Sequence, residues 1–287
     1  MIFFQRFLFS VLAAFVVFSV DLLGSHSLLP EKRKASNQGQ IDTATLGHRP
    51  FVVVSPPKCG THLIGKTLSL ILNKGPAYHL SNLGSNTQAI GMVKKEMKNG
   101  SFAIAHNFSE ESIRQLVVEG YKVIFIMRDP RDHVVSVQSW FQEGQWSWMP
   151  VSKIQNPHLQ LTELITGAKT GERAFELFFL RYASAVAGIS KKNLYSARFE
   201  KLVGVEGGGN FNDQVEEVIG LATFLEVPMT IERAENIAHK IFGGTNTFRK
   251  GQIGIWKEVF SESQKQAFKS IYNNYLIQYG YEKNGDW

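Results

Sequence analysis

The sequence is poor in groups that form disulfides or bind metals. Its 287 residues contain a single cysteine, Cys59, so no disulfide can form within the chain. The eight histidines are dispersed, and no spacing of Cys, His, Asp or Glu matches a metal-ligand set. We therefore predict a protein that uses no metal.

Strong charge and internal repeats are also lacking. Lysine and arginine number 31 against 25 acidic residues, which gives a net charge of +6, and the basic residues are scattered along the chain. No nucleic-acid partner is therefore expected, and the mild positive charge is more typical of a small anionic ligand. The hydrophobic content of 44% and charged content of 20% are those of an ordinary globular protein.

A long apolar run lies near the N-terminus, at residues 7–20. Its length matches the core of a signal peptide and is short of the roughly 20 residues that a membrane-spanning helix needs. We predict an N-terminal signal or membrane-anchor segment (1–23), a linker or stem (24–49) and one large domain (50–287). If the segment is an anchor, the basic stretch EKRK at 31–34 leaves the domain in the cytosol by the positive-inside rule. A cleaved signal, leading to a Golgi-type lumen or the secretory pathway, is the alternative.

Beyond residue 50, short apolar runs alternate with helical patterns. The apolar runs predict buried strands at residues 51–55, 101–106, 121–127 and 193–199. Helical spacing and helix-start signals predict helices at residues 61–73, 110–120, 130–141, 172–189, 213–225, 231–242 and 262–279. This alternation predicts an α/β fold with a mainly parallel central sheet and helices on both faces.

The first predicted strand leads into a stretch that fits two phosphate-binding loops. The segment GTHLIGKT, Gly60 to Thr67, matches the Walker A pattern of nucleotide triphosphatases. A Walker A loop normally begins where its strand ends, with the helix starting near its lysine. Under this interpretation residues 56–59 lie unexplained between strand and loop. A P-loop kinase or NTPase using Gly60–Thr67 is therefore the alternative interpretation.

The second loop, PPKCGTH at residues 56–62, follows the strand directly. It predicts a helix that begins at Thr61 or His62, with Lys66 at an ordinary position inside it. In this interpretation Lys58, just past the strand end, faces the ligand. We favour this second loop.

Four stretches resemble, in order, the family of sulfotransferases that use 3′-phosphoadenosine 5′-phosphosulfate (PAPS). PPKCGTH resembles the loop around the donor's 5′-phosphosulfate. RDPRDHVVS, from Arg128 to Ser136, resembles the 3′-phosphate motif, and FRKGQIGIWKEVF at 248–260 resembles the C-terminal motif that returns to that phosphate. His106 matches the position of the family's catalytic base.

The resemblance implies a P-loop-like sulfotransferase fold, with 50–287 as the catalytic domain. It also implies an enzyme that moves a sulfuryl group from PAPS to a hydroxyl or amine of a small-molecule or glycan acceptor. Lys58 would stabilise the leaving oxygen and His106 would accept the acceptor's proton. The donor-binding residues that the motifs imply are Lys58, Cys59, Gly60, Thr61, His62, Arg128, Ser136, Arg249, Lys250 and Gly251.

The chain departs from the family pattern around the adenine. His62 and Leu63 stand where the family commonly has Thr-Trp, and Phe199 stands in place of a tyrosine that reaches the adenine. A non-catalytic, nucleotide-binding relative is therefore a third interpretation. Arg128 also has a simple structural alternative, which is an ion pair with Asp132 four residues on.

Overall fold

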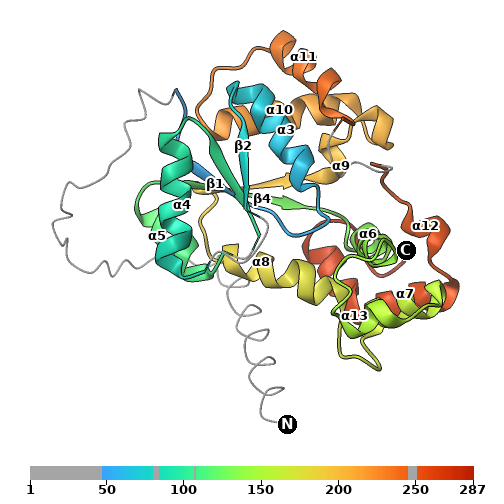
Figure 1. Ribbon diagram of the computed structural model, residues 1–287. Coiled ribbons are helices and arrows are strands. Elements are labelled where there is room, and N and C mark those ends of the chain that lie inside the picture. The colour runs from blue at the N-terminus through green and yellow to red at the C-terminus, as the bar shows by residue number, and fades with distance from the viewer. Residues whose placement is uncertain (1–46, 80–83, 107, 245–250) are drawn as a thin grey trace, which may run out of the picture.

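The computed structural model describes residues 47–79, 84–106, 108–244 and 251–287. Within them, five strands form one parallel sheet in the order β2-β3-β1-β4-β5 (Figure 1). The strands are β1 (Phe51–Val54), β2 (Pro76–His79), β3 (Phe102–Ala105), β4 (Lys122–Met127) and β5 (Leu194–Arg198). The predicted α/β fold with a parallel central sheet is thereby confirmed.

The central strands are buried because helices cover both faces of the sheet. Every residue of β1 and β3 is buried, as expected for strands of a parallel sheet. Helices α3, α10 and α11 lie over one face and α4, α5 and α8 over the other, while α6, α7, α12 and α13 form a further group beside the sheet (Figure 1). The helices are α3 (Thr61–Leu72), α4 (Asn86–Lys98), α5 (Glu110–Val118), α6 (Pro130–Gln142), α7 (Pro157–Thr166), α8 (Arg181–Val186), α9 (Phe199–Leu202), α10 (Phe211–Phe224), α11 (Ile231–Ile241), α12 (Trp256–Val259) and α13 (Glu262–Gln278).

Local signals set the starts of several helices. Ser109 caps α5 by accepting a hydrogen bond from the Ser112 backbone N–H, and Asp129 caps α6 with Pro130 at its first position. Side-chain acceptors at these positions satisfy N–H groups that have no partner inside the helix. The predicted starts of both helices are confirmed.

The sequence analysis did not predict β2, α4 or α7, nor the short helices α9 and α12. β2 is a half-exposed edge strand that begins with Pro76, so it lacks the apolar run by which the other strands were predicted. Helix α4 carries a signal that was overlooked, a capping box between Ser85 and Gln88. Helix α7 begins with Pro157 after an Asn156 cap, which is also a recognisable start.

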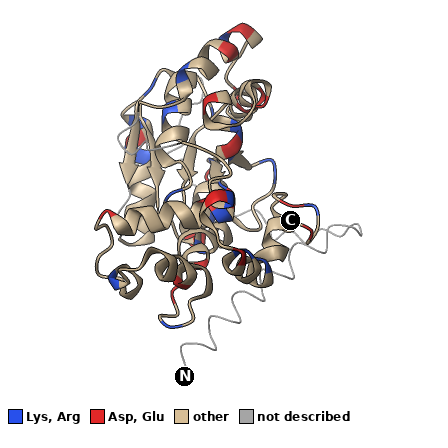
Figure 2. Cartoon of the chain, turned by 90° about the vertical axis from the view of Figure 1, so that its right-hand side faces the viewer, with Lys and Arg blue, Asp and Glu red and all other residues tan. Residues whose placement is uncertain are grey.

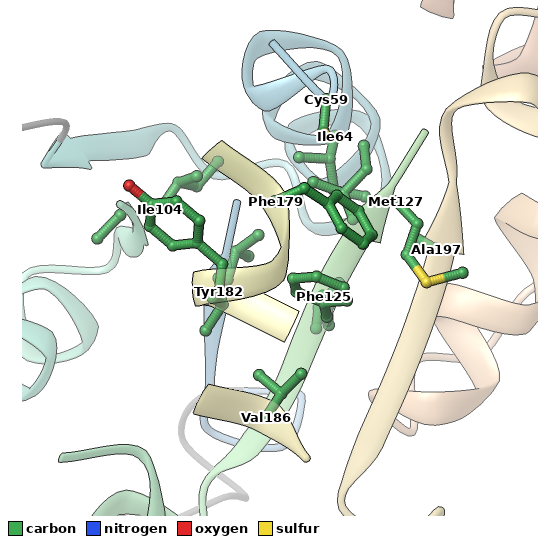
Figure 3. Close-up of a cluster of buried hydrophobic side chains, with 14 of the residues drawn as sticks. Cys59, Ile64, Ile104, Phe125, Met127, Phe179, Tyr182, Val186 and Ala197 are labelled. Atoms are coloured by element: carbon green, nitrogen blue, oxygen red, sulfur yellow. The ribbon is translucent and has the colours of Figure 1, made fainter. Parts of the chain in front are cut away.

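The predicted helix at 172–189 is confirmed in place, but part of it is a π-helical turn, Glu176–Leu180. Phe179 from this turn packs with Phe125 of β4, and Tyr182 and Val186 of α8 extend the same apolar cluster over the sheet (Figure 3). The cluster anchors α8 beside the carboxyl ends of the strands.

Among the described residues, no helix combines the length and the apolar content required to cross a membrane. The apolar run at 7–20 lies outside those residues.

Candidate active site

Three candidate residues follow the carboxyl ends of three neighbouring strands. Lys58 lies in the loop after β1, His106 follows β3 directly and Arg128 follows β4 directly. These strands are adjacent in the order β3-β1-β4 and run parallel. Their ends therefore meet at one edge of the sheet, where ligands bind in open α/β folds.

The loop at 55–60 joins β1 to α3 and has the form that the second loop interpretation predicts. Helix α3 begins at Thr61, and Gly60 precedes it with a φ of 100°. A Cβ at Gly60 would lie 2.8 Å from the Phe199 ring, so both the backbone angle and the close approach favour glycine there. Among the described residues, no side chain caps this helix N-terminus.

Lys66 lies inside α3 and points away from this loop. Its Nζ donates hydrogen bonds to the carbonyl oxygens of Gly243 at 2.8 Å and Phe242 at 3.4 Å, just past the end of α11. The lysine thus stabilises a helix C-terminus, which favours positive charge. This placement contradicts the Walker interpretation of Gly60–Thr67.

Lys58 is held in the loop by contacts on both its main chain and its side chain. Its φ of 66° is unusual for a residue with a Cβ. Its carbonyl oxygen accepts a hydrogen bond from Arg128 Nη1 at 3.2 Å, and its ammonium lies 3.8 Å from the centroid of the Trp140 ring on α6. The ring face attracts a cation, so Trp140 directs the lysine side chain towards α6.

His106 is 9% exposed and lies beside the same loop. Val54 pairs with Ala105 in the sheet, so Ser55 and His106 come next to each other as their strands end. His106 Nδ1 is hydrogen-bonded to the Ser55 carbonyl oxygen. Because a carbonyl only accepts, Nδ1 carries the proton and Nε2 keeps its lone pair in the neutral ring.

Burial lowers the pKa of His106 to about 4, although the hydrogen bond to Ser55 opposes this shift. The ring is therefore neutral at physiological pH. A neutral histidine with Nε2 free can accept a proton, which is the role predicted for it.

Arg128 links the loop to the C-terminal part of the chain. Its Nη2 donates to the Gln252 carbonyl oxygen at 3.3 Å, and its guanidinium lies 4.2 Å from the centroid of the Phe199 ring. Asp132 accepts instead from the backbone N–H groups of Gly254 at 2.6 Å and Trp256 at 3.0 Å. These contacts argue against the simple Arg128–Asp132 pair.

Gly251 immediately precedes Gln252, and its φ is 60°. Because Arg128 contacts the Gln252 carbonyl, the main chain that follows Gly251 reaches the predicted 3′-phosphate site. The other two predicted residues of this motif, Arg249 and Lys250, lie outside the described residues.

Thr61 and His62, at the start of α3, differ in how far their side chains are exposed. The Thr61 and Ser55 hydroxyl oxygens lie 2.7 Å apart in a buried hydrogen bond. The half-buried His62 ring packs 4.5 Å from the Tyr78 ring, and burial, aided by nearby Lys58, lowers its pKa. His62 is thus neutral and exposed enough to contact a ligand.

Cys59 is fully buried, and its side chain belongs to the apolar cluster of Figure 3. Burial raises the pKa of its thiol, which keeps it protonated. Its backbone N–H donates to the Pro56 carbonyl oxygen at 3.2 Å. The side chain of Cys59 is therefore part of the core, and its role in donor binding stays a prediction.

Ser136 lies on α6 between two residues that contact the loop. His133 Nε2 donates to the Pro57 carbonyl oxygen at 3.1 Å, and Trp140 contacts Lys58. Residues spaced three and four apart share one face of a helix. The half-buried Ser136 therefore faces the loop as well.

His133 is a residue of the site that the sequence interpretation missed. It is fully buried, and burial together with nearby Arg128 lowers its pKa to about 3. The ring is therefore neutral, and it fixes the Pro56–Pro57 turn that precedes Lys58. Its spacing from Ser136 along the predicted helix was the signal that could have revealed it.

We expect His133→Gln to change how stability depends on pH. The folded pKa of His133 is depressed from an ordinary 6.5, so its neutral form stabilises the fold above that pH and the benefit is lost as pH falls towards 3. Below pH 6.5, the difference in unfolding free energy between wild type and the Gln variant should shrink by up to about 1.4 kcal/mol per pH unit. Urea unfolding at pH 7.5, 6.5 and 5.5 measures this. The exposed His239→Gln serves as the control, and a difference for His133→Gln that does not vary with pH would contradict a buried neutral ring.

Charged residues of both signs are interspersed over the described helices and loops (Figure 2). Within the same ranges, no group of three or more His, Cys, Asp or Glu side chains is arranged to hold a metal ion. Lys58 and Arg128 at the strand ends supply positive charge that attracts an anion to the site.

Comparison with known proteins identifies the family and the fold of this chain. Residues 48–242 match the model of the sulfotransferase domain family. Sulfotransferase 6B1 of Danio rerio is 24% identical over 170 residues, which cover 54% of this chain and 52% of that protein. The chain therefore spans about half the length of this curated relative.

Two solved structures share the fold. Mouse sulfotransferase SULT7A1 complexed with PAP matches with a TM-score of 0.57 and 18% identity, over 79% of this chain and 84% of that one. Retinol dehydratase in complex with androsterone and inactive cofactor PAP matches with a TM-score of 0.51 and 17% identity, over 79% and 81% of the two chains.

The family match covers well over half of the chain. The protein therefore belongs to the sulfotransferase domain family. The family resemblance predicted from the four motifs is confirmed.

Proposed function

We propose that this protein transfers a sulfuryl group from PAPS to a hydroxyl or amine of a small-molecule or glycan acceptor. The observation that carries the proposal is the placement of Lys58, His106 and Arg128 at the ends of three adjacent parallel strands. This arrangement suits a donor that has anionic groups at both ends. Lys58 lies in the loop before a helix, the neutral His106 lies beside that loop, and the Arg128 guanidinium provides a second anion site.

The residues present fit such a donor. The backbone N–H groups in the first turn of α3 have no carbonyl partner inside the helix. They can therefore donate hydrogen bonds to the 5′-phosphosulfate. Arg128 donates from Nη1 and Nη2 to one main-chain carbonyl each, so each of these nitrogens has a second N–H left for the 3′-phosphate. Ser136 faces the same loop and is assigned to that phosphate with it.

His106 acts on the acceptor in this proposal. Its Nε2 takes the proton of the attacking hydroxyl or amine, while the hydrogen bond from Nδ1 to Ser55 keeps the ring in the required tautomer. The negative charge of a bound donor beside the ring would raise the pKa of His106 from about 4 towards neutrality, which makes it a stronger base.

Lys58 acts on the leaving group. As the new bond to sulfur forms, the bond between sulfur and the 5′-phosphate oxygen breaks, and its electron pair stays on that oxygen. An ammonium held at this point interacts more strongly with the developing charge than with the ground state. Trp140 restricts where the lysine side chain lies before that step.

Nucleotide selectivity tests the proposal directly. Adenosine 3′,5′-bisphosphate (PAP) should raise the melting temperature of the protein, because a ligand that binds only the folded state stabilises it. ATP with Mg²⁺ should not. Stabilisation by ATP with Mg²⁺ and none by PAP would instead support a nucleotide triphosphatase.

We expect Arg128→Ala to weaken PAP far more than 5′-AMP, because 5′-AMP lacks the 3′-phosphate. The lost charge-assisted hydrogen bonds should cost about 1.5–3 kcal/mol of PAP binding, with a smaller loss for Ser136→Ala. Isothermal titration calorimetry with both nucleotides measures the difference. Arg233→Ala is a matched control, because Arg233 also donates to two main-chain carbonyls, those of Pro228 and Ile71, but does so from α11. Equal losses for PAP and 5′-AMP would remove the assignment.

For the N-terminus, we propose a membrane anchor with the catalytic domain in the cytosol. The support is the basic stretch at 31–34 after the apolar run. A sequon at Asn107 bears on the same point, since a glycan next to His106 would obstruct an acceptor. Protease protection in sealed vesicles tests the orientation, and a protected domain or a glycan on Asn107 would reverse it.

A further inference from the structure

Glu200 is a half-buried residue whose carboxyl group lies behind Arg128. It belongs to the short helix α9, which directly follows β5. Its Oε1 accepts a hydrogen bond from the Asp129 backbone N–H at 2.6 Å. Its Oε2 is also buried, but has no hydrogen-bond partner in the part of the chain that the structure describes.

Glu200 and its neighbour Phe199 hold Arg128 from two directions. The Phe199 ring lies against the guanidinium, with 4.2 Å from its centroid to Cζ. Glu200 fixes the peptide that follows Arg128, and the Asp129 side chain in turn caps α6 through the Arg131 backbone N–H. The orientation of Arg128 therefore depends on residues about 70 positions further along the chain.

We propose that Glu200 positions Arg128 and takes up a proton when the donor's 3′-phosphate binds. This inference rests on the proposed function, because it requires a phosphate at Arg128. It assigns Glu200 a role in donor binding without contact between Glu200 and the donor.

The groups that face Glu200 explain why its charge responds to the ligand. Burial raises the pKa of Glu200 to about 7, the negative charge of Asp129 adds to this shift, and Arg128 opposes it. The positive charge of Arg128 stabilises the ionised form of Glu200. A phosphate bound to Arg128 would offset this stabilisation and add negative charge nearby. Both effects raise the pKa of Glu200 further, so a carboxylate that is partly ionised at neutral pH becomes protonated.

Among the described residues, two other titratable groups lie beside Glu200, and neither can take up this proton. Cys59, from the loop after β1, and Tyr281, from the segment after α13, each have a pKa raised by burial and by the Glu200 charge. Both are therefore already neutral at pH 7 and have no proton to gain. By linkage, PAP affinity should fall as pH rises through neutrality, by at most about tenfold per pH unit.

Calorimetry of PAP binding at pH 7.5, in two buffers of different ionisation enthalpy, measures the protons taken up. At this pH phosphate monoesters, whose second pKa is about 6, are almost fully ionised whether free or bound. Wild type should take up a fraction of a proton per PAP bound. Glu200→Gln keeps an oxygen that can accept a hydrogen bond from the Asp129 N–H, but its side chain cannot titrate. This variant should therefore take up measurably fewer protons per PAP bound than wild type. Its PAP affinity should also vary less between pH 6.5 and 8.

Glu217→Gln is the matched control. Glu217, which lies on α10, is also buried and has a raised pKa. Its Oε1, however, accepts a hydrogen bond from the Arg198 backbone N–H. Its substitution should leave proton uptake at the wild-type value.

The outcomes distinguish a failure of the proposed Glu200 role from a failure of the proposed function. Equal proton uptake by wild type and Glu200→Gln would overturn the role of Glu200. If the Gln variant does not fold, His106→Asn takes its place, because it removes the other group whose pKa the bound donor would raise, and an absence of proton uptake by this variant would overturn the role equally. Folded wild type that does not bind PAP at all would instead overturn the proposed function.

Discussion

Lys58→Ala should lower kcat for sulfuryl transfer by about 10²–10³-fold, which is the usual effect of removing one electrostatic contact to a developing negative charge. The lysine lies in the loop between β1 and α3, and its ammonium rests near α6, 3.8 Å from the centre of the Trp140 ring. Because the contact strengthens as the leaving oxygen gains charge, the loss should appear in kcat more than in KM. Steady-state kinetics with labelled PAPS measures both constants.

Lys66→Ala is the control for that experiment. It removes the same charge from the same stretch of sequence, but its ammonium is hydrogen-bonded to the Gly243 carbonyl oxygen near the end of α11. Its kcat should therefore stay within a few-fold of wild type, with a small loss of stability. A larger loss of activity for Lys66→Ala than for Lys58→Ala would support the Walker loop after all.

His106→Ala should reduce transfer by about 10²–10⁴-fold, the contribution of a positioned general base. PAP binding should stay within a few-fold of wild type, because the spent donor carries no proton for a base to remove. The substitution also removes the hydrogen bond to the Ser55 carbonyl oxygen. His106→Asn, which has a side-chain amide donor but no basic nitrogen, separates that structural effect from catalysis.

Calorimetry with PAP decides between the two roles of His106. Retained binding with lost turnover in both variants supports the base. If PAP affinity collapses together with activity, His106 holds the loop at 55–60 in place, and the base must be sought elsewhere at the site.

The parts of the site that sequence reasoning recovered are local in the chain. The strand at Phe51–Val54, the loop after it and a helix beginning at Thr61 follow from an apolar run, a proline pair and helical spacing within about twenty residues. The start of α6 after Arg128 follows from Asp129 and Pro130 in the same way. Such signals act through the backbone conformation of neighbouring residues, so they can be read without knowing the rest of the fold.

The parts it missed join residues that are distant in sequence. His133 contacts Pro57 from α6, and Glu200 contacts the Asp129 backbone from the end of β5. Neither residue type is informative alone, since glutamate is mostly exposed in folded proteins and histidine is found both inside and at the surface. Burial and a specific partner gave these residues their role, and both depend on how the strands are ordered in the sheet.

The sequence by itself determined the fold class, the family and the chemical groups at the strand ends, because each rests on short-range patterns in a fixed order. Only the tertiary structure decided where the side chains of the two lysines lie and in which state the histidines exist. Lys58 and Lys66 are eight residues apart, yet the start of α3 at Thr61 directs one to the loop and the other to α11. The neutral state and tautomer of His106 come from burial and from a carbonyl supplied by the adjacent strand, and strand pairing alone brings those two groups together.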